Sequence, residues 1–138
     1  MKKLLEPGSV AVIGASRNPR SVGYGVLQSL VEGSVLHSPY AEGFNGKVYA
    51  INPNAKKILG QKCYASVLDV KGRVDLAVVC VPAKIVPFVL RECAQKKVGA
   101  VAVLSAGFAE LGAEGKQKQK EIVEIAEKGG FPLLGPNC

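Results

Sequence analysis

Apolar residues along the chain fall into short unbroken runs and longer stretches with helical spacing. The unbroken runs are rich in valine, isoleucine, leucine and alanine and predict strands, because a strand buried on both faces of a sheet is apolar at every position. They cover residues 10–13, 76–81, 100–104 and 131–134. A further strand is predicted over residues 47–54, with Val48, Tyr49 and Ile51 as its β-formers and Asn52-Pro53 as its end. Helical spacing covers residues 22–31, 83–97 and 114–128. This alternation predicts an α/β fold: a doubly wound, Rossmann-like parallel sheet of about five strands with helices on both faces.

The segments between these elements have turn-forming residues or no sustained period. Residues 33–46 are rich in glycine, serine and proline and predict a loop, which contains His37, the only histidine. Without a partner this histidine is expected at the surface. Residues 56–60 predict a short connection and residues 64–69 a brief helical turn. Pro87 falls in the first turn of its helix, where a missing N–H is tolerated, and Gly99 and the pair Gly129-Gly130 are expected to end two helices.

Composition is that of one ordinary globular domain. The 138 residues are 48% hydrophobic and 21% charged, which gives no sign of disorder. No apolar run approaches the roughly 20 residues that cross a bilayer, and no signal core is visible, so a cytoplasmic protein without a membrane partner is expected. The four cysteines, Cys63, Cys80, Cys93 and Cys138, have no pairing or metal spacing, which favours small buried thiols in a reducing compartment.

The formal charge of +7 raises the hypothesis of a nucleic-acid partner. Lysine and arginine are scattered along the whole chain, aromatic residues make up only 6%, and no recognised binding module accompanies them. No nucleic-acid partner is therefore expected. A small polyanionic ligand accounts for the charge more economically.

The turn after the first strand is the strongest candidate for binding a phosphate. Gly14 ends the strand, and a helix follows the polar segment 16–21, so backbone N–H groups and the positive end of the helix dipole face one point. Arg17 and Arg20 flank that point. A dinucleotide fingerprint is broken here, because Ala15 follows Gly14 and the next glycines are Gly23 and Gly25, and the segment is no Walker loop. The alternative is a purely structural turn, with Gly23 and Gly25 allowing the helix to pack closely.

Doubly wound sheets bind ligands beyond the carboxyl ends of their strands, near the switch in strand order. Four such ends are small, polar or glycine-bearing in this sequence, and basic residues lie beside two of them. The candidate ligand-binding residues are Gly14, Ala15, Ser16, Arg17, Asn18, Asn52, Pro53, Lys56, Val81, Pro82, Ser105, Ala106 and Gly107. No residue stands out as a general base, so no catalytic residue and no metal site is assigned.

The end of the second strand indicates what kind of ligand is bound. NAD-binding folds usually place Asp or Glu there to bind the ribose hydroxyls, whereas this chain has Asn52-Pro53 with Lys56 and Lys57 just beyond. A carboxylate would repel a phosphorylated ribose, and an amide with nearby lysines would accept one. The ligand is therefore expected to be coenzyme A or NADP. A plain turn with exposed lysines is the alternative.

Five motifs, in order along nearly the whole chain, resemble one known family. They are SVAVIGAS with a later VGYG, KVYAINPN followed by ILGQKCYASVLDV, VDLAVVCVP, AVAVLSAGFAE, and LLGPNC. In this order they resemble the CoA-binding domain of the ADP-forming acyl-CoA synthetases, which is related to the alpha subunit of succinyl-CoA synthetase. Two features depart from the family pattern: Asn54 stands where relatives often have lysine, and the loop over residues 33–46 is long.

The resemblance implies how coenzyme A lies. Residues 14–18 would hold the phosphates, Asn52, Pro53 and the lysines beyond would meet the adenosine end, and Val81-Pro82 with residues 105–107 would line the path of the pantetheine arm. The family converts acyl-CoA, ADP and phosphate to acid, CoA and ATP through a phosphorylated histidine in a later domain.

This chain is therefore expected to be a CoA-binding domain of a larger ligase, working with other domains or subunits, and both homo-oligomers and hetero-oligomers stay open. A stand-alone CoA-binding sensor and an NADP-binding redox domain are the alternatives.

Overall fold

The computed structural model describes residues 7–32, 46–106, 108 and 112–136. Within them, seven strands form one sheet in the order β3-β4-β2-β1-β5-β6-β7, and every neighbouring pair is parallel except β3 and β4. The strands are β1 (Ser9–Ile13), β2 (Lys47–Ile51), β3 (Lys57–Ile58), β4 (Gln61–Tyr64), β5 (Leu76–Val79), β6 (Ala100–Val103) and β7 (Leu133–Leu134). The predicted doubly wound α/β fold is thereby confirmed.

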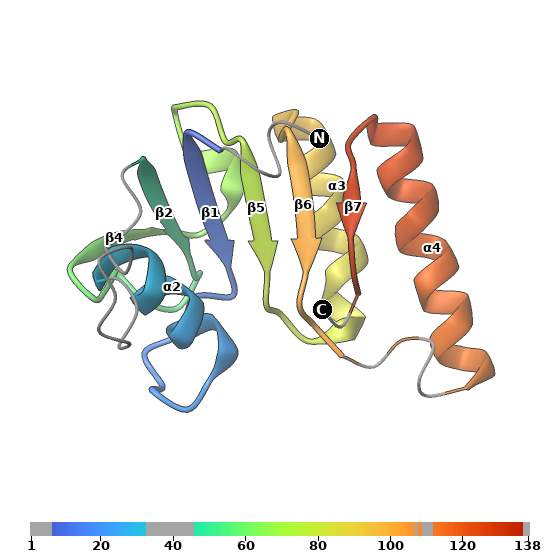
Figure 1. Cartoon of the computed structure of the whole chain (residues 1–138), viewed down its shortest axis with the longest axis horizontal. Helices are drawn as coiled ribbons and strands as arrows, with labels where there is room; N and C mark the ends of the chain where they lie inside the picture. Colours follow the sequence, from blue (N-terminus) through green and yellow to red (C-terminus); the bar gives the residue numbers. More distant parts are fainter. Residues whose placement is uncertain (1–6, 33–45, 107, 109–111, 137–138) are drawn as a thin grey trace, which may run out of the picture.

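In the described part of the chain, three α-helices cover the two faces of the sheet (Figure 1). They are α2 (Val22–Glu32), α3 (Val86–Lys96) and α4 (Ala113–Gly129), and two short 3₁₀ turns, Val67–Asp69 and Ala83–Ile85, lie in the connections. Leu27 of α2 is buried with Val12 on one face. Leu90 of α3 and Ile122 of α4 belong to the larger core on the other face. None of the helices in the described ranges is both long and apolar enough to span a membrane.

The strand count is higher than the predicted five because residues 57–64 form a hairpin. Ile58 pairs with Gln61 across a two-residue turn, and β4 then joins β2 in parallel. Leu59 and Gly60 have φ values of 49° and 77°, the left-handed conformation that such tight hairpin turns require. Residues 57–60, predicted as part of a connection, therefore extend the sheet, whereas the predicted brief turn near residues 64–69 is present as Val67–Asp69.

One of the two helix ends that glycines predict is confirmed. Gly130 ends α4 in the left-handed conformation, as the glycine pair predicts. The helix predicted over residues 83–97 ends at Lys96, and Lys97, in place of Gly99, takes the left-handed position with φ 61°. The backbone N–H of Gly99 is bonded to Val74 O, so this glycine leads into β6. The predicted loop over residues 33–46 lies outside the described residues except for residue 46.

The strand order reverses at β1, and this places the ligand-binding edge. The chain runs from β1 through α2 to β2 on one side, and β5, β6 and β7 follow on the other. In such sheets the crevice between the two directions opens at the carboxyl ends of the strands. These ends lie at the lower edge of the sheet in Figure 1.

Candidate functional site

Two adjoining hollows lie along the carboxyl edge of the sheet. The first, of about 360 Å³, lies between the ends of β1 and β2 and the start of α3. The second, of about 470 Å³, lies between the ends of β5 and β6 and the start of α2. Both are lined by Cys80, Val81 and Pro82, so these three residues form their common wall.

Most of the predicted ligand residues lie in these hollows. The first hollow is lined by Gly14, Ala15, Ser16, Asn52, Pro53, Val81 and Pro82, and the second by Val81, Pro82, Ser105 and Ala106. Arg17, Asn18 and Lys56 line neither hollow and are exposed. Gly107 lies outside the described residues. Two loops, after β1 and after β2, thus meet at one place, and the loops after β5 and β6 meet beside it.

The turn after β1 is built by backbone packed on backbone. Gly14 has a φ of 95°, and a Cβ on it would lie 2.9 Å from the carbonyl carbon of Cys80. A Cβ on Gly23 would lie 2.0 Å from the oxygen of Gly14, so α2 begins directly against the turn. Close packing by Gly23 is therefore confirmed. For Gly25 it is wrong, because a Cβ there would meet no described atom within 4 Å.

The segment between the turn and α2 is held by its own side chains. Ser16 Oγ accepts from the backbone N–H of Asn18 at 3.0 Å, and Asn18 Oδ1 accepts from that of Arg20 at 3.0 Å. Ser21 Oγ accepts from the N–H of Tyr24 at 3.2 Å, as an N-cap residue does. No hydrogen bond to another described group is found for the N–H of Ala15, Ser16 or Arg17. Three consecutive backbone N–H groups between β1 and α2 therefore have no partner among the described residues, and the first of these residues, Ala15, is 2% exposed.

Asn52 joins the end of β2 to this turn. Its Nδ2 donates to the oxygen of Ala15 at 2.8 Å, and its Oδ1 accepts from the N–H of Asn54 at 2.7 Å. An aspartate or glutamate here would have no amide to donate to Ala15. The amide thus fixes the turn as well as leaving the site without a negative charge at this strand end.

The loop after β6 is tied to the loop after β5 by one side chain. Ser105 is 8% exposed, and its Oγ donates to the oxygen of Val81. This bond holds the far wall of the second hollow against the common wall. The position of Ser105 therefore follows from the strand order, which puts β6 beside β5.

Several residues at the hollows were not predicted as ligand residues. Ile85 and Phe88 line the first hollow and are 40% and 61% exposed, and Val22, 59% exposed, lines the second. Glu92 also lines the first hollow. Phe88 had a signal in the sequence, because it falls outside the apolar stripe of its helix. Large apolar side chains left exposed beside a hollow are typical of a binding surface.

The cysteine thiols of the described residues have raised pKa values. Burial raises the pKa of Cys80, in the common wall, to about 11, and it raises the pKa of Cys93, in the core, to about 12 with a further contribution from Glu92. Burial also raises the pKa of Cys63, and the charge of Arg17 opposes this rise. All three thiols are therefore protonated near neutral pH. Of the predicted buried thiols, Cys93 is fully buried, Cys63 and Cys80 are partly exposed, and Cys138 lies outside the described residues.

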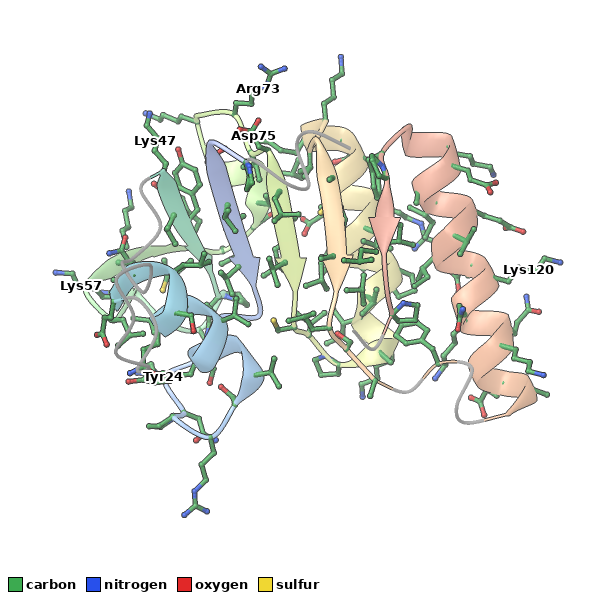
Figure 2. The ribbon with its side chains drawn as sticks, in the orientation of Figure 1. Tyr24, Lys47, Lys57, Arg73, Asp75 and Lys120 are labelled. Carbon is green, nitrogen blue, oxygen red and sulfur yellow. The ribbon has the colours of Figure 1, made fainter. Side chains whose placement is uncertain are left out.

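Basic residues surround the sheet on several sides. Figure 2 shows Lys57 on the hairpin, Lys120 on α4, and Lys47 and Arg73 at the amino edge of the sheet, opposite the edge with the hollows. The positive charge is thus distributed around the molecule, as the sequence indicates.

An open parallel sheet that reverses its strand order beside such an edge is typical of Rossmann-like domains, which bind nucleotide cofactors. Within the class of Rossmann-like domains, the sequence identifies one family. Residues 8–138 match the model of the family described as CoA binding domain, and the chain belongs to this family.

Similar proteins include ADP-forming ligases. The chain is 44% identical to acetate–CoA ligase (ADP-forming) II of Archaeoglobus fulgidus, with 99% of this chain and 19% of the relative aligned. It is 45% identical to acetate–CoA ligase (ADP-forming) I subunit alpha of Pyrococcus furiosus, covering 99% of this chain and 29% of that subunit. The chain is thus a CoA-binding domain homologous to subunits of ADP-forming acyl-CoA synthetases, and it spans less than a third of their length.

A solved structure has the same fold. Acetyl-coenzyme A synthetase 1 of Ca. Korarchaeum cryptofilum, described as dinucleotide forming and solved with phosphate and ADP, superimposes with a TM-score of 0.87 at 38% identity. The match covers 99% of this chain and 27% of that one.

Proposed function

We propose that this chain binds coenzyme A along the carboxyl edge of the sheet and holds its thiol for acyl transfer. The observation that carries the proposal is the pair of adjoining hollows, which reach from the end of β2 to the end of β6. Coenzyme A has a flat base at one end and a thin flexible arm at the other. An edge with two joined hollows suits both parts, and the family of the chain supports coenzyme A over NADP.

The phosphates lie at the turn after β1 in this proposal. The N–H groups of Ala15, Ser16 and Arg17, which have no partner among the described residues, support an anion site, and no acidic residue lies in the first turn of α2 to oppose one. Arg17 and Arg20 are exposed beside the turn. Anions at such a place gain from the N-terminal end of the helix dipole.

The adenosine end lies at the first hollow, beside Asn52 and Pro53. Lys56 is exposed just beyond them, so its ammonium group can reach a phosphate on the ribose without being buried. The pantetheine arm follows Val81 and Pro82 toward Ser105 and Ala106. Gly107 lies outside the described residues, so its proposed place along the pantetheine arm rests on the sequence alone.

The acyl transfer itself needs parts of the protein that this chain does not hold. Relatives of three to five times its length carry the activity of an ADP-forming ligase, one of them as a subunit alpha. We infer that this chain works with further domains or subunits, which convert acyl-CoA, ADP and phosphate to acid, CoA and ATP. This chain contributes by positioning coenzyme A. Because the thiol is held in place, its reaction with the acyl group becomes an effectively unimolecular step.

Thermal unfolding with four ligands tests the proposal. Coenzyme A at about 100 times its dissociation constant should stabilise the fold by about 2.7 kcal/mol, which raises the unfolding midpoint by roughly 5–10 °C for a domain of this size. Dephospho-coenzyme A should act more weakly, and NAD and NADP should have little effect. A shift with NADP and none with coenzyme A would instead favour a redox domain.

Lys56→Ala tests the ribose phosphate separately. Because the side chain is exposed, its loss should weaken coenzyme A by about fivefold or less and leave dephospho-coenzyme A nearly unchanged. Lys120→Ala, on α4 and away from the hollows, is the matched control (Figure 2). Equal weakening of both ligands by Lys56→Ala would contradict the assigned contact.

A further inference from the structure

The first hollow is apolar except for a few polar side chains. Ile51, Ile85, Phe88 and Val89 are among its lining residues, and Phe88 is 61% exposed. Its volume of about 360 Å³ falls within the range of roughly 300–1,000 Å³ usual for small-molecule sites. A flat, weakly polar ring system suits such walls, because aromatic faces stack on each other.

Only three of the lining side chains carry hydrogen-bonding groups that are not sulfur, and two of them already bond to neighbouring backbone groups. Asn52 uses both ends of its amide, on Ala15 and Asn54. Ser16 Oγ accepts from the N–H of Asn18. The third is Glu92, which is partly buried and lies on α3.

One carboxylate oxygen of Glu92 accepts a hydrogen bond, and the other has no partner among the described residues. Glu92 Oε2 accepts from Ser66 Oγ at 2.7 Å, and Ser66 in turn caps the 3₁₀ turn Val67–Asp69. For Oε1 no hydrogen-bond partner is found among the described residues, and none of the ion pairs between them includes Glu92. Ser66 therefore orients a carboxylate that has a free acceptor beside an apolar hollow.

We propose that Glu92 selects the base of the bound nucleotide by accepting a hydrogen bond from an exocyclic amino group. This rests on the proposed function, in which the adenine of coenzyme A occupies the first hollow. An ionised carboxylate has acceptors only, so it favours an amino group and repels an oxo group at the same ring position. Glu92 thus discriminates adenine from hypoxanthine, and Ser66 is a positioning residue for it.

The test compares two ligands on each variant. Dissociation constants are measured by calorimetry for coenzyme A and for its analogue with hypoxanthine in place of adenine. The chain as it stands should prefer coenzyme A by about tenfold, since one hydrogen bond to a charged group is at stake. Glu92→Gln should narrow or reverse this preference, because an amide can donate to the oxo group. The ratio on one variant is unaffected by any loss of folded protein.

Two further variants separate selection from folding. Ser66→Ala removes the bond to Glu92 and the cap of the 3₁₀ turn, so it should lower the unfolding temperature and reduce the preference only in part. Glu127→Gln, exposed on α4, should change neither quantity. If Glu92→Gln binds both ligands with the ratio of the unchanged chain, the inference is overturned while the CoA site stands. If the unchanged chain binds neither ligand, the proposed function fails and the inference fails with it.

Discussion

Replacing Gly23 with alanine should separate α2 from the turn that it is built against. The new Cβ would lie 2.0 Å from the oxygen of Gly14 and 3.0 Å from its carbonyl carbon. Carbon atoms in contact need roughly 3.5 Å, so the start of the helix must retreat by about 1 Å or more. Both groups in the clash are backbone or fixed to it, and no side-chain rotation can relieve the overlap.

The expected magnitude follows from two opposing terms. Forcing extra atoms into a packed place costs about 1–3 kcal/mol or more, whereas alanine gains about 1 kcal/mol over glycine inside a helix. Gly25 lies two residues further in the same helix, and a Cβ there meets no described atom within 4 Å. Gly25→Ala should therefore stabilise the fold slightly and serves as the matched control. Because the gain over glycine is common to both variants, they should differ by the packing cost, about 1–3 kcal/mol or more.

The assay is thermal unfolding of both variants with and without coenzyme A. Gly23→Ala should unfold roughly 5–15 °C below Gly25→Ala and should also lose affinity for coenzyme A, because its helix start moves away from the proposed phosphate site. Gly25→Ala should bind as the unchanged chain does. If the two alanine variants unfold at the same temperature, the close packing of α2 on the turn is refuted.

Two further predictions concern helix ends and thiols. Lys97 and Gly130 both have the left-handed conformation after a helix, with φ values of 61° and 72°. Lys97→Gly should therefore raise the free energy of unfolding by about 1 kcal/mol, and Gly130→Ala should lower it by a similar amount. Urea unfolding measures both changes, and two changes of the same sign would contradict this prediction. Burial raises the pKa of Cys80 to about 11 and that of Cys93 to about 12. Because only the thiolate reacts, alkylation of the folded chain at about pH 8 should label Cys63 first of these three, with rates that rise as pH rises toward each pKa. Mass spectrometry of the digested protein gives the order, and early labelling of Cys93 would show that the core opens.

The pattern of apolar residues determined most of the sheet and the edge that carries the site. The runs around β1, β5 and β6 are apolar at nearly every position, and such runs are stable only when buried on both faces of a parallel sheet. Because parallel strands end at one edge, the residues after them could be grouped before any contact was known. Gly14, Asn52, Val81 and Ser105 lie at this edge as predicted.

The hairpin of β3 and β4 could not be predicted from local preferences. Leu59 occupies a left-handed turn position that a branched side chain rarely adopts, so the turn carries no typical Asn-Gly signal. The four residues of β4 are polar or half-buried, and they become a strand because Cys63 and Tyr64 pair with Ala50 and Ile51. That pairing depends on the position of β2, which lies more than ten residues earlier.

The sequence by itself determined the class of fold, the order of its elements and the family, because these depend on periodicity and on motifs that are local in the chain. Tertiary structure alone decided which side chains share a hollow. It placed Glu92 of α3 within reach of Ser66 and beside Asn52, residues up to forty positions apart, and it left Phe88 exposed at their side. Packing sets such neighbours through the crossing of helix and sheet, and no short stretch of sequence contains that information.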